Sequence, residues 1–144
     1  AQAKKKINDK NVKFINAFAE KLPFHKKYFD VVTVSFGIRN FSNIDKSLGE
    51  VFKVLKDSGT FYCLEFSQIN NKVLNNLYQL YSKIIPTYGS ILANDSDSYK
   101  YLIKSIESFP NQVELSKKIK EAGFKQIEVL DIIDGLASIH IARK

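Results

Sequence analysis

Arg39 and Asn40 are the adjacent polar residues best placed to do chemistry in this chain of 144 residues. They follow directly after Phe29–Gly37, a run of apolar and β-branched residues that ends at a glycine and predicts a buried parallel strand. Functional groups of a parallel sheet gather at the carboxyl ends of its strands. An arginine there can stabilise an anionic oxygen, and an asparagine can orient a substrate. The residues alone leave an equal alternative, in which Arg39 begins a surface loop and Asn40 is a cap.

Other reactive side chains are sparse, and this excludes several kinds of site. Cys63 is the only cysteine, so no intramolecular disulfide or multi-cysteine metal site can form. Its place in an apolar run predicts a buried, reduced thiol. His25 and His140 are the only histidines and have no carboxylates at ligand spacing, so we expect no metal site. The acidic residues also lack the paired spacing that is typical of hydrolysis.

The positive charge of the chain lies mostly at one end. The formal net charge is +7, and residues 1–27 alone hold eight lysines against Asp9 and Glu20. A local excess of this kind is typical of a solvated helix face, with weak attraction to anionic lipid or nucleic acid as the alternative. Because the remainder is nearly balanced in charge, we expect no nucleic-acid partner.

The first half of the chain predicts alternating strands and helices, as in an α/β domain. A loosely alternating run, Val12–Ala19, predicts a strand before Phe29–Gly37. An amphipathic helix is predicted from the capping-box spacing at Ser42–Asp45 to a stop at Gly59. Thr60–Phe66 predicts the next buried strand. This strand–helix–strand unit implies parallel pairing with a right-handed crossover.

The second half predicts added helices. Apolar stripes favour one helix over residues 73–85, which Pro86 ends, and another over Ser98–Phe109. A third helix is predicted to begin after Asn111, with Glu114 as its capping partner three residues later. Gly123 has the place of a left-handed residue that ends this helix.

The end of the chain predicts an antiparallel hairpin. Two short runs, Lys125–Ile133 and Leu136–Ala142, carry β-branched residues, and the second alternates apolar with polar side chains. Asp134-Gly135 between them is a tight-turn dipeptide. No repeat, low-complexity tract or linker divides the chain, so one domain is expected.

Several short motifs stand in a characteristic order. The most specific are FGIRN at Phe36–Asn40, LEFS at Leu64–Ser67 and NDSDSYKYL at Asn94–Leu102. Supporting stretches in the same order are Ala19–Phe24, Phe29–Asp30, Val54–Lys56, Ser105–Ile106 and Ala122–Phe124. Together these motifs resemble the ubiquinone/menaquinone biosynthesis C-methyltransferase family. The resemblance implies a Rossmann-like fold whose last strand inserts antiparallel to the others.

The resemblance further implies one partial domain, the C-terminal part of a Rossmann-like methyltransferase fold. Its parts are a basic N-terminal segment at 1–11, the remainder of the cofactor-side sheet at 12–66, inserted substrate-side helices at 71–109, and a helix with a terminal hairpin at 111–144. Nothing here corresponds to the family's glycine-rich turn or to the acid that holds the ribose hydroxyls. We therefore expect residues 1–144 alone to be inactive and not to bind the cofactor unaided.

The resemblance also assigns roles to individual residues. Arg39 is expected to stabilise the substrate phenolate, directly or through water, and Asn40 to orient the site. The residues implied in cofactor binding come from two segments and are Phe18, Ala19, Ser35, Phe36 and Gly37. The residues implied in substrate binding lie in the added helices and are Tyr78, Tyr81, Asp95 and Tyr99. Taken by themselves, both sets also fit ordinary strand positions and helix packing.

The implied function is C-methylation of a polyprenylated quinol precursor in ubiquinone or menaquinone biosynthesis, with S-adenosylmethionine as the cofactor and the prenylated quinol as the partner. One alternative is a non-catalytic, truncated methyltransferase-like module. Such a module could form a homo-oligomer, because the strand at Val12–Ala19 would have lost its neighbour and would expose unpaired backbone groups. A weaker alternative is a nucleic-acid binder that uses the N-terminal lysines.

The sequence also bears on location. No apolar run is long enough to cross a membrane, and residues 1–11 lack the apolar stretch of a secretory signal. We therefore expect a cytoplasmic protein with at most peripheral contact with a membrane surface.

Overall fold

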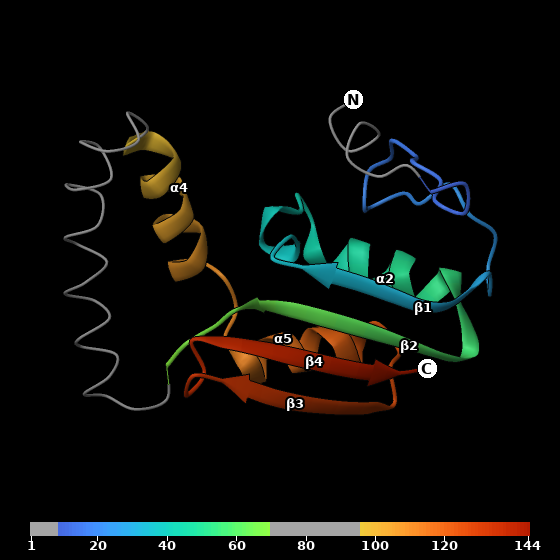
Figure 1. Cartoon of the computed structure of the whole chain (residues 1–144). Coiled ribbons are helices and arrows are strands. Elements are labelled where there is room, and N and C mark those ends of the chain that lie inside the picture. The colour runs from blue at the N-terminus through green and yellow to red at the C-terminus, as the bar shows by residue number, and fades with distance from the viewer. Residues whose placement is uncertain (1–8, 70–95) are drawn as a thin grey trace.

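The described part of the chain is an α/β structure. The computed structural model describes residues 9–69 and 96–144, with residues 96–100 described by their backbone alone. Figure 1 shows the arrangement of the elements. In chain order they are β1 (Phe29–Ser35), a short 3-10 helix η1 (Ile38–Asn40), α2 (Ile44–Val54), β2 (Leu55–Phe66), α4 (Ser96–Glu107), α5 (Gln112–Glu121), β3 (Gln126–Ile132) and β4 (Ala137–Arg143). The helix predicted over residues 73–85 lies outside the described residues.

The strands form one mixed sheet in the order β1-β2-β4-β3. β1 pairs parallel to β2, and α2 is the crossover between them. β4 inserts antiparallel between β2 and β3. The tight turn of the hairpin contains Ile133, Asp134 and Gly135, all with positive φ. The predicted parallel pair and the predicted terminal hairpin are both confirmed.

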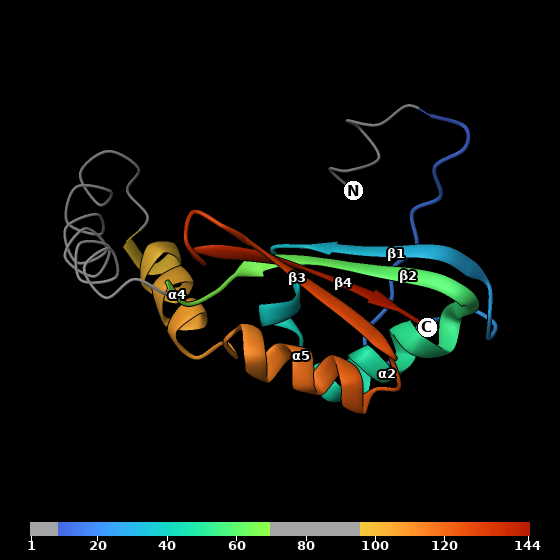
Figure 2. The same ribbon diagram turned by 90° about the horizontal axis from the view of Figure 1, so that it is seen from below.

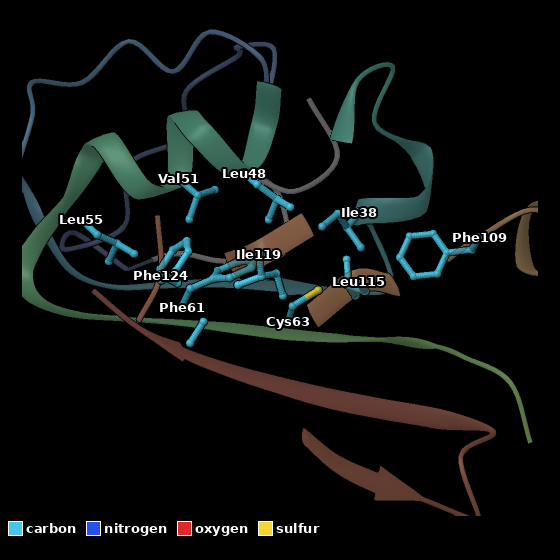
Figure 3. Packing of buried hydrophobic residues seen from close by; sticks show 11 residues of the cluster. Ile38, Leu48, Val51, Leu55, Phe61, Cys63, Phe109, Leu115, Ile119 and Phe124 are labelled. Carbon is cyan, nitrogen blue, oxygen red and sulfur yellow. The ribbon is translucent and has the colours of Figure 1, made fainter. Parts of the chain in front are cut away.

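One face of the sheet is covered by α2 and α5 (Figure 2). Side chains of alternate strand residues point toward these helices, so that Phe61 and Cys63 of β2 are fully buried. Figure 3 shows how they pack against Leu48 of α2 and Ile119 of α5. The other buried members of this cluster are Ile38, Val51, Leu55, Phe109, Leu115, Phe124 and Ala142.

Local signals explain where the helices begin. The side chain of Asn111 accepts hydrogen bonds from Val113 N and Glu114 N, and the Glu114 carboxylate accepts one from Asn111 N, so the predicted capping box is confirmed. At α2 the prediction was wrong by one residue. The N-cap is Asn43 rather than Ser42, and its Oδ1 accepts from Lys46 N at 2.8 Å.

Gly59 was predicted to end α2, but it lies within β2. The helix ends at Val54, and Leu55 already has an extended conformation. A Cβ at position 59 would lie 2.9 Å from Lys56 O and 3.1 Å from Asp30 O. The glycine is therefore required by a close approach of backbone, not by a helix stop.

The strand predicted over Val12–Ala19 is not formed, so the described sheet begins at Phe29 and not at Val12, where the predicted 12–66 segment starts. Residues 12–17 have no regular structure, and the nearest pairing is an isolated bridge between Phe18 and Lys21. A strand needs a partner, and no described strand pairs with this run or with the outer edge of β1. Local β-propensity was therefore not sufficient.

Candidate functional site

A cleft lies between two loops, one that precedes β1 (its lining residues lie within 13–24) and one that follows β1 (lining residues within 37–42). Its volume is about 720 Å³, within the size range of small-molecule sites. Four residues predicted from the sequence line it: Phe18, Ala19, Gly37 and Asn40. The remaining lining residues are Lys13, Ile15, Ala17, Glu20, Leu22, Phe24, Phe41 and Ser42.

Two hydrogen bonds attach the N-terminal wall of this cleft to α2. Leu22 N donates to Glu50 Oε2 at 2.9 Å, and Asn43 N donates to Glu20 Oε1 at 3.0 Å. Backbone hydrogen bonds hold the pKa of the Glu20 carboxyl below its usual value. Although the predicted strand is absent, the loop is thus held beside the carboxyl end of β1.

Arg39 lies at that same end, in η1, and pairs with Glu65 near the end of β2. Ile38 is buried and anchors the turn in the core. Arg39 Nη1 donates to Glu65 Oε1 at 2.5 Å, with the two side chains 11% and 1% exposed. The guanidinium also lies over the ring of Phe66, 5.4 Å from its centroid. Because β1 and β2 pair in parallel, their carboxyl ends lie side by side, and these residues meet at that end of the sheet.

Phe36 marks the point at which the chain leaves β1. Its φ of 48° lies in the left-handed region, which is uncommon for a residue with a side chain. Its ring packs against Phe66 with 4.7 Å between centroids, and its N–H donates to Leu64 O at 2.8 Å. The β2 backbone and the Phe66 ring therefore hold the strained turn that presents η1.

Asn40 is joined to α4. Tyr101 donates from its hydroxyl to Asn40 Oδ1 at 2.9 Å, although both side chains are exposed. This contact fixes one end of the Asn40 amide, and α4 and η1 are in contact.

The structure brings some of the predicted site residues together and leaves others apart. Phe18, Ala19, Gly37 and Asn40 share the cleft, whereas Arg39 faces Glu65. Ser35 and Phe36 lie at the end of β1 and are not among the lining residues. Tyr78, Tyr81 and Asp95 lie outside the described residues, as does the side chain of Tyr99, whose backbone belongs to α4.

Two residues of this site were missed from the sequence, Glu65 and Tyr101. The signal for Glu65 was present: it follows Phe61 and Cys63 at intervals of two, so strand alternation places it on the same buried side. A carboxylate on a buried strand face needs a cation or several donors. Tyr101 gave no comparable signal, because it fitted the apolar stripe of its helix.

The predicted burial of Cys63 is confirmed. Burial, with a further contribution from the charge of Glu65, raises the pKa of the Cys63 thiol to about 12, so this cysteine is a buried, reduced residue. Within residues 9–69 and 96–144, no group of three or more His, Cys, Asp or Glu side chains is arranged to hold a metal ion. No helix among these residues is long and apolar enough to cross a membrane.

Comparisons with known proteins point in one direction. The sequence profile of the ubiE/COQ5 methyltransferase family matches residues 1–144. A mitochondrial 2-methoxy-6-polyprenyl-1,4-benzoquinol methylase of Bos taurus is 47% identical over 123 residues, which are 85% of this chain and 37% of that protein. A ubiquinone/menaquinone biosynthesis C-methyltransferase of Rickettsia prowazekii is 44% identical over 147 residues, which are 99% of this chain and 59% of that protein.

The fold is also found among solved structures. A SAM-dependent methyltransferase of Thermotoga maritima matches with a TM-score of 0.66 at 18% identity, over 90% of this chain and 63% of that one. At this identity the likeness concerns the fold alone, and it confirms the predicted Rossmann-like methyltransferase fold. The chain spans 37% of the bovine relative and 59% of the Rickettsia relative.

Proposed function

The chain belongs to the ubiE/COQ5 methyltransferase family, and from this premise we propose that it forms part of an S-adenosylmethionine-dependent enzyme that C-methylates a polyprenylated quinol. The names of the bovine and Rickettsia relatives, a polyprenyl-benzoquinol methylase and a ubiquinone/menaquinone C-methyltransferase, support this substrate class. The observation that carries the proposal is the placement of Arg39, a cation fixed at the carboxyl edge of the parallel pair beside a ligand-sized cleft.

The residues of the cleft fit part of the cofactor. Phe18 is 80% exposed, and a ring that is free on the surface is available to stack on an adenine. Ala19 and Gly37 leave room beside it. Glu20 is the one carboxylate among the lining residues, and its Oε1 already accepts from Asn43 N. The chain therefore supplies an adenine-side wall, while the grip on the ribose and the methionine is left to other groups.

The proposed chemistry places a modest demand on this chain. S-adenosylmethionine supplies an electrophilic methyl group on a sulfonium. A quinol ring carbon becomes nucleophilic when a phenolic proton is lost, and Arg39 would stabilise the resulting phenolate. Asn40, whose amide oxygen is held by Tyr101, would offer its amide N–H group to orient the ring.

A chimeric protein tests this proposal. In it, these 144 residues replace the matched part of the Rickettsia relative, and transfer of labelled methyl to a prenylated quinol is measured. We expect transfer by the chimera, and a loss of about a hundredfold or more on Arg39→Ala, because a lost oxyanion partner has roughly this effect. An inactive chimera, prepared beside an active Rickettsia protein, would contradict the proposal. If the Arg39→Ala chimera transfers methyl at a rate within about threefold of the parent chimera, Arg39 does not have the proposed role.

Binding of the cofactor by the chain alone is a separate measurement. We expect titration calorimetry with S-adenosylmethionine to give no heat for the 144-residue chain and a clear signal for the chimera, because the cleft covers only one side of the ligand. Heat from the chain alone would show that its own residues suffice.

A second candidate role is self-association as a non-catalytic module. It is favoured by the outer edge of β1, which pairs with no described strand.

For location, the proposal is a cytoplasmic enzyme with peripheral contact to the membrane surface, because a prenylated substrate resides in the membrane. Co-sedimentation of the chimera with lipid vesicles would detect this contact.

A further inference from the structure

Glu65 is a buried carboxylate in the middle of the candidate site. Its side chain is 1% exposed and lies on the helix-covered side of β2, in line with Phe61 and Cys63. A lone carboxylate in such a place is strongly unfavourable. Three donors compensate it: Arg39 Nη1, Arg39 N at 3.4 Å and Phe66 N at 2.9 Å. Two of these donors belong to Arg39, so Glu65 binds both the backbone and the side chain of that residue.

The contacts of Arg39 leave its side chain little freedom. Glu65 holds one end of the guanidinium, the ring of Phe66 covers one face, and Ile38 fixes the backbone in the core. A planar guanidinium held in this way presents its remaining N–H groups in fixed directions. The pair is also neutral as a whole, so Arg39 is not a free surface charge.

One donor of this fixed group is unused. Arg39 Nε is buried and has no hydrogen-bond partner within the described part of the chain. Ser67 Oγ, two residues beyond Glu65 on the same segment, is in the same condition. A buried polar atom without a partner is costly, and native proteins rarely keep one without a reason. Two such atoms, one of them in the guanidinium of Arg39 itself, favour a polar ligand as their partner.

We propose that Glu65 is a positioning residue for Arg39: it neutralises and orients the guanidinium so that its remaining N–H groups bind an anionic oxygen of phenolate type. The ligand class rests on the function proposed above, whereas the positioning itself rests on the contacts of Glu65. Glu65, the carboxylate of the LEFS segment, therefore determines how strongly Arg39 binds the ligand, in addition to any effect on folding.

The chain suits a direct test, because it contains only two arginines, Arg39 and Arg143. Heteronuclear NMR resolves arginine Nε–H groups, and Arg143→Lys assigns the two signals. The probe is 4-nitrophenol, at a pH at which it is ionised. In the wild-type chain we expect the probe to shift the Arg39 signal and to leave the signal of the exposed Arg143 in place.

Two variants then separate positioning from folding. Glu65→Gln keeps the length of the side chain and removes its charge, whereas Glu65→Asp keeps the charge and withdraws it by one methylene. We expect both to weaken the response of Arg39 to the probe by about tenfold or more, since hydrogen bonds to charged groups are worth at least that much. Glu65→Asp should unfold at nearly the wild-type temperature, because it still compensates the buried cation.

Equal probe affinities in the wild type and Glu65→Asp would overturn the positioning role, and so would a wild-type chain in which the probe moves neither arginine. Should Glu65→Gln fail to fold, Glu65→Asp decides alone. An inactive chimera would overturn the proposed methyl transfer without changing the probe result, so the two failures are distinguishable.

Discussion

At the scale of single residues, His140 is a titratable group that the fold buries completely. It lies on β4, is fully buried, and has Nε2 at 3.1 Å from Gln112 O. Its Nδ1 has no partner within the described residues. Burial lowers the pKa of His140, although the hydrogen bond to Gln112 and the charge of Asp131 oppose this. The fold therefore favours the neutral form of the ring.

This burial predicts a loss of stability in mild acid. Because the folded-state pKa lies below the unfolded value, the unfolded chain binds a proton first, and stability is complete only above about pH 6.5. As the pH falls from there toward the lowered folded-state pKa, the free energy of unfolding should decrease by at most about 1.4 kcal/mol per pH unit for this one proton. Urea unfolding at about pH 8 and about pH 5.5 measures the effect.

The second histidine provides the control for that measurement. His25 is exposed, so His25→Gln should keep the wild-type dependence on pH, whereas His140→Gln should lose most of it. The account of His140 fails if both variants retain the same slope.

At the scale of elements, α2 tests which residue caps a helix. Asn43 Oδ1 accepts from Lys46 N, and Asn43 O accepts from Ser47 Oγ, whereas no side-chain cap from Ser42 is seen. Asn43→Ala should therefore reduce the free energy of unfolding by about 1 kcal/mol, measured in urea. The matched variant Ser42→Ala should change it by less than about 0.5 kcal/mol. If both variants lose the same free energy of unfolding, Ser42 contributes to the cap as the sequence predicted.

Elements with signals in their own residues could be predicted from the sequence. The capping box at Asn111, the turn at Asp134-Gly135 and the apolar run from Phe29 each specify a local structure, and each is found. The predicted burial of the strand from Phe29 is wrong, because β1 lies at the end of the described sheet and none of its residues is buried. Val12–Ala19 differs because a strand is stabilised by pairing, and the neighbour it needs is not among the described strands.

The site was predictable to a similar degree. Motif resemblance located Arg39 and Asn40 at the edge of the sheet, and four of the predicted residues share one cleft. The motif could not show that Arg39 is neutralised, because its partner Glu65 comes from another strand, and only the parallel register brings the two together. In the structure, Arg39 is therefore one half of an oriented ion pair and not a free cation.

At the scale of the whole molecule, the sheet is covered on one side only within the described residues. α2 and α5 pack on one face, and no described helix covers the other, as Figure 2 shows. By the strand register, this second face carries the exposed side chains of Val31, Tyr62, Leu130 and Ile132, which together are called the open face. Apolar area of this kind is usually an interaction surface. It adjoins the outer edge of β1, which is unpaired among the described strands.

An open face beside an open edge predicts that the chain alone self-associates. Sedimentation velocity of the wild-type chain should show a weight-average mass that rises with concentration. Val31 is 50% exposed, on β1 and on the open face, so Val31→Lys should lower the association constant by about tenfold or more, since lysines on edge strands oppose pairing.

The control places the same charge on the other side of the molecule. Val113 is 78% exposed on α5, so Val113→Lys should associate like the wild type if the open face is the contact. A monomeric wild-type chain at every concentration would contradict self-association. In the chimera the added part of the Rickettsia relative should compete for the same surface, so we expect association to weaken there as methyl transfer appears. Joint loss of association and gain of activity would connect the two candidate roles through the open face.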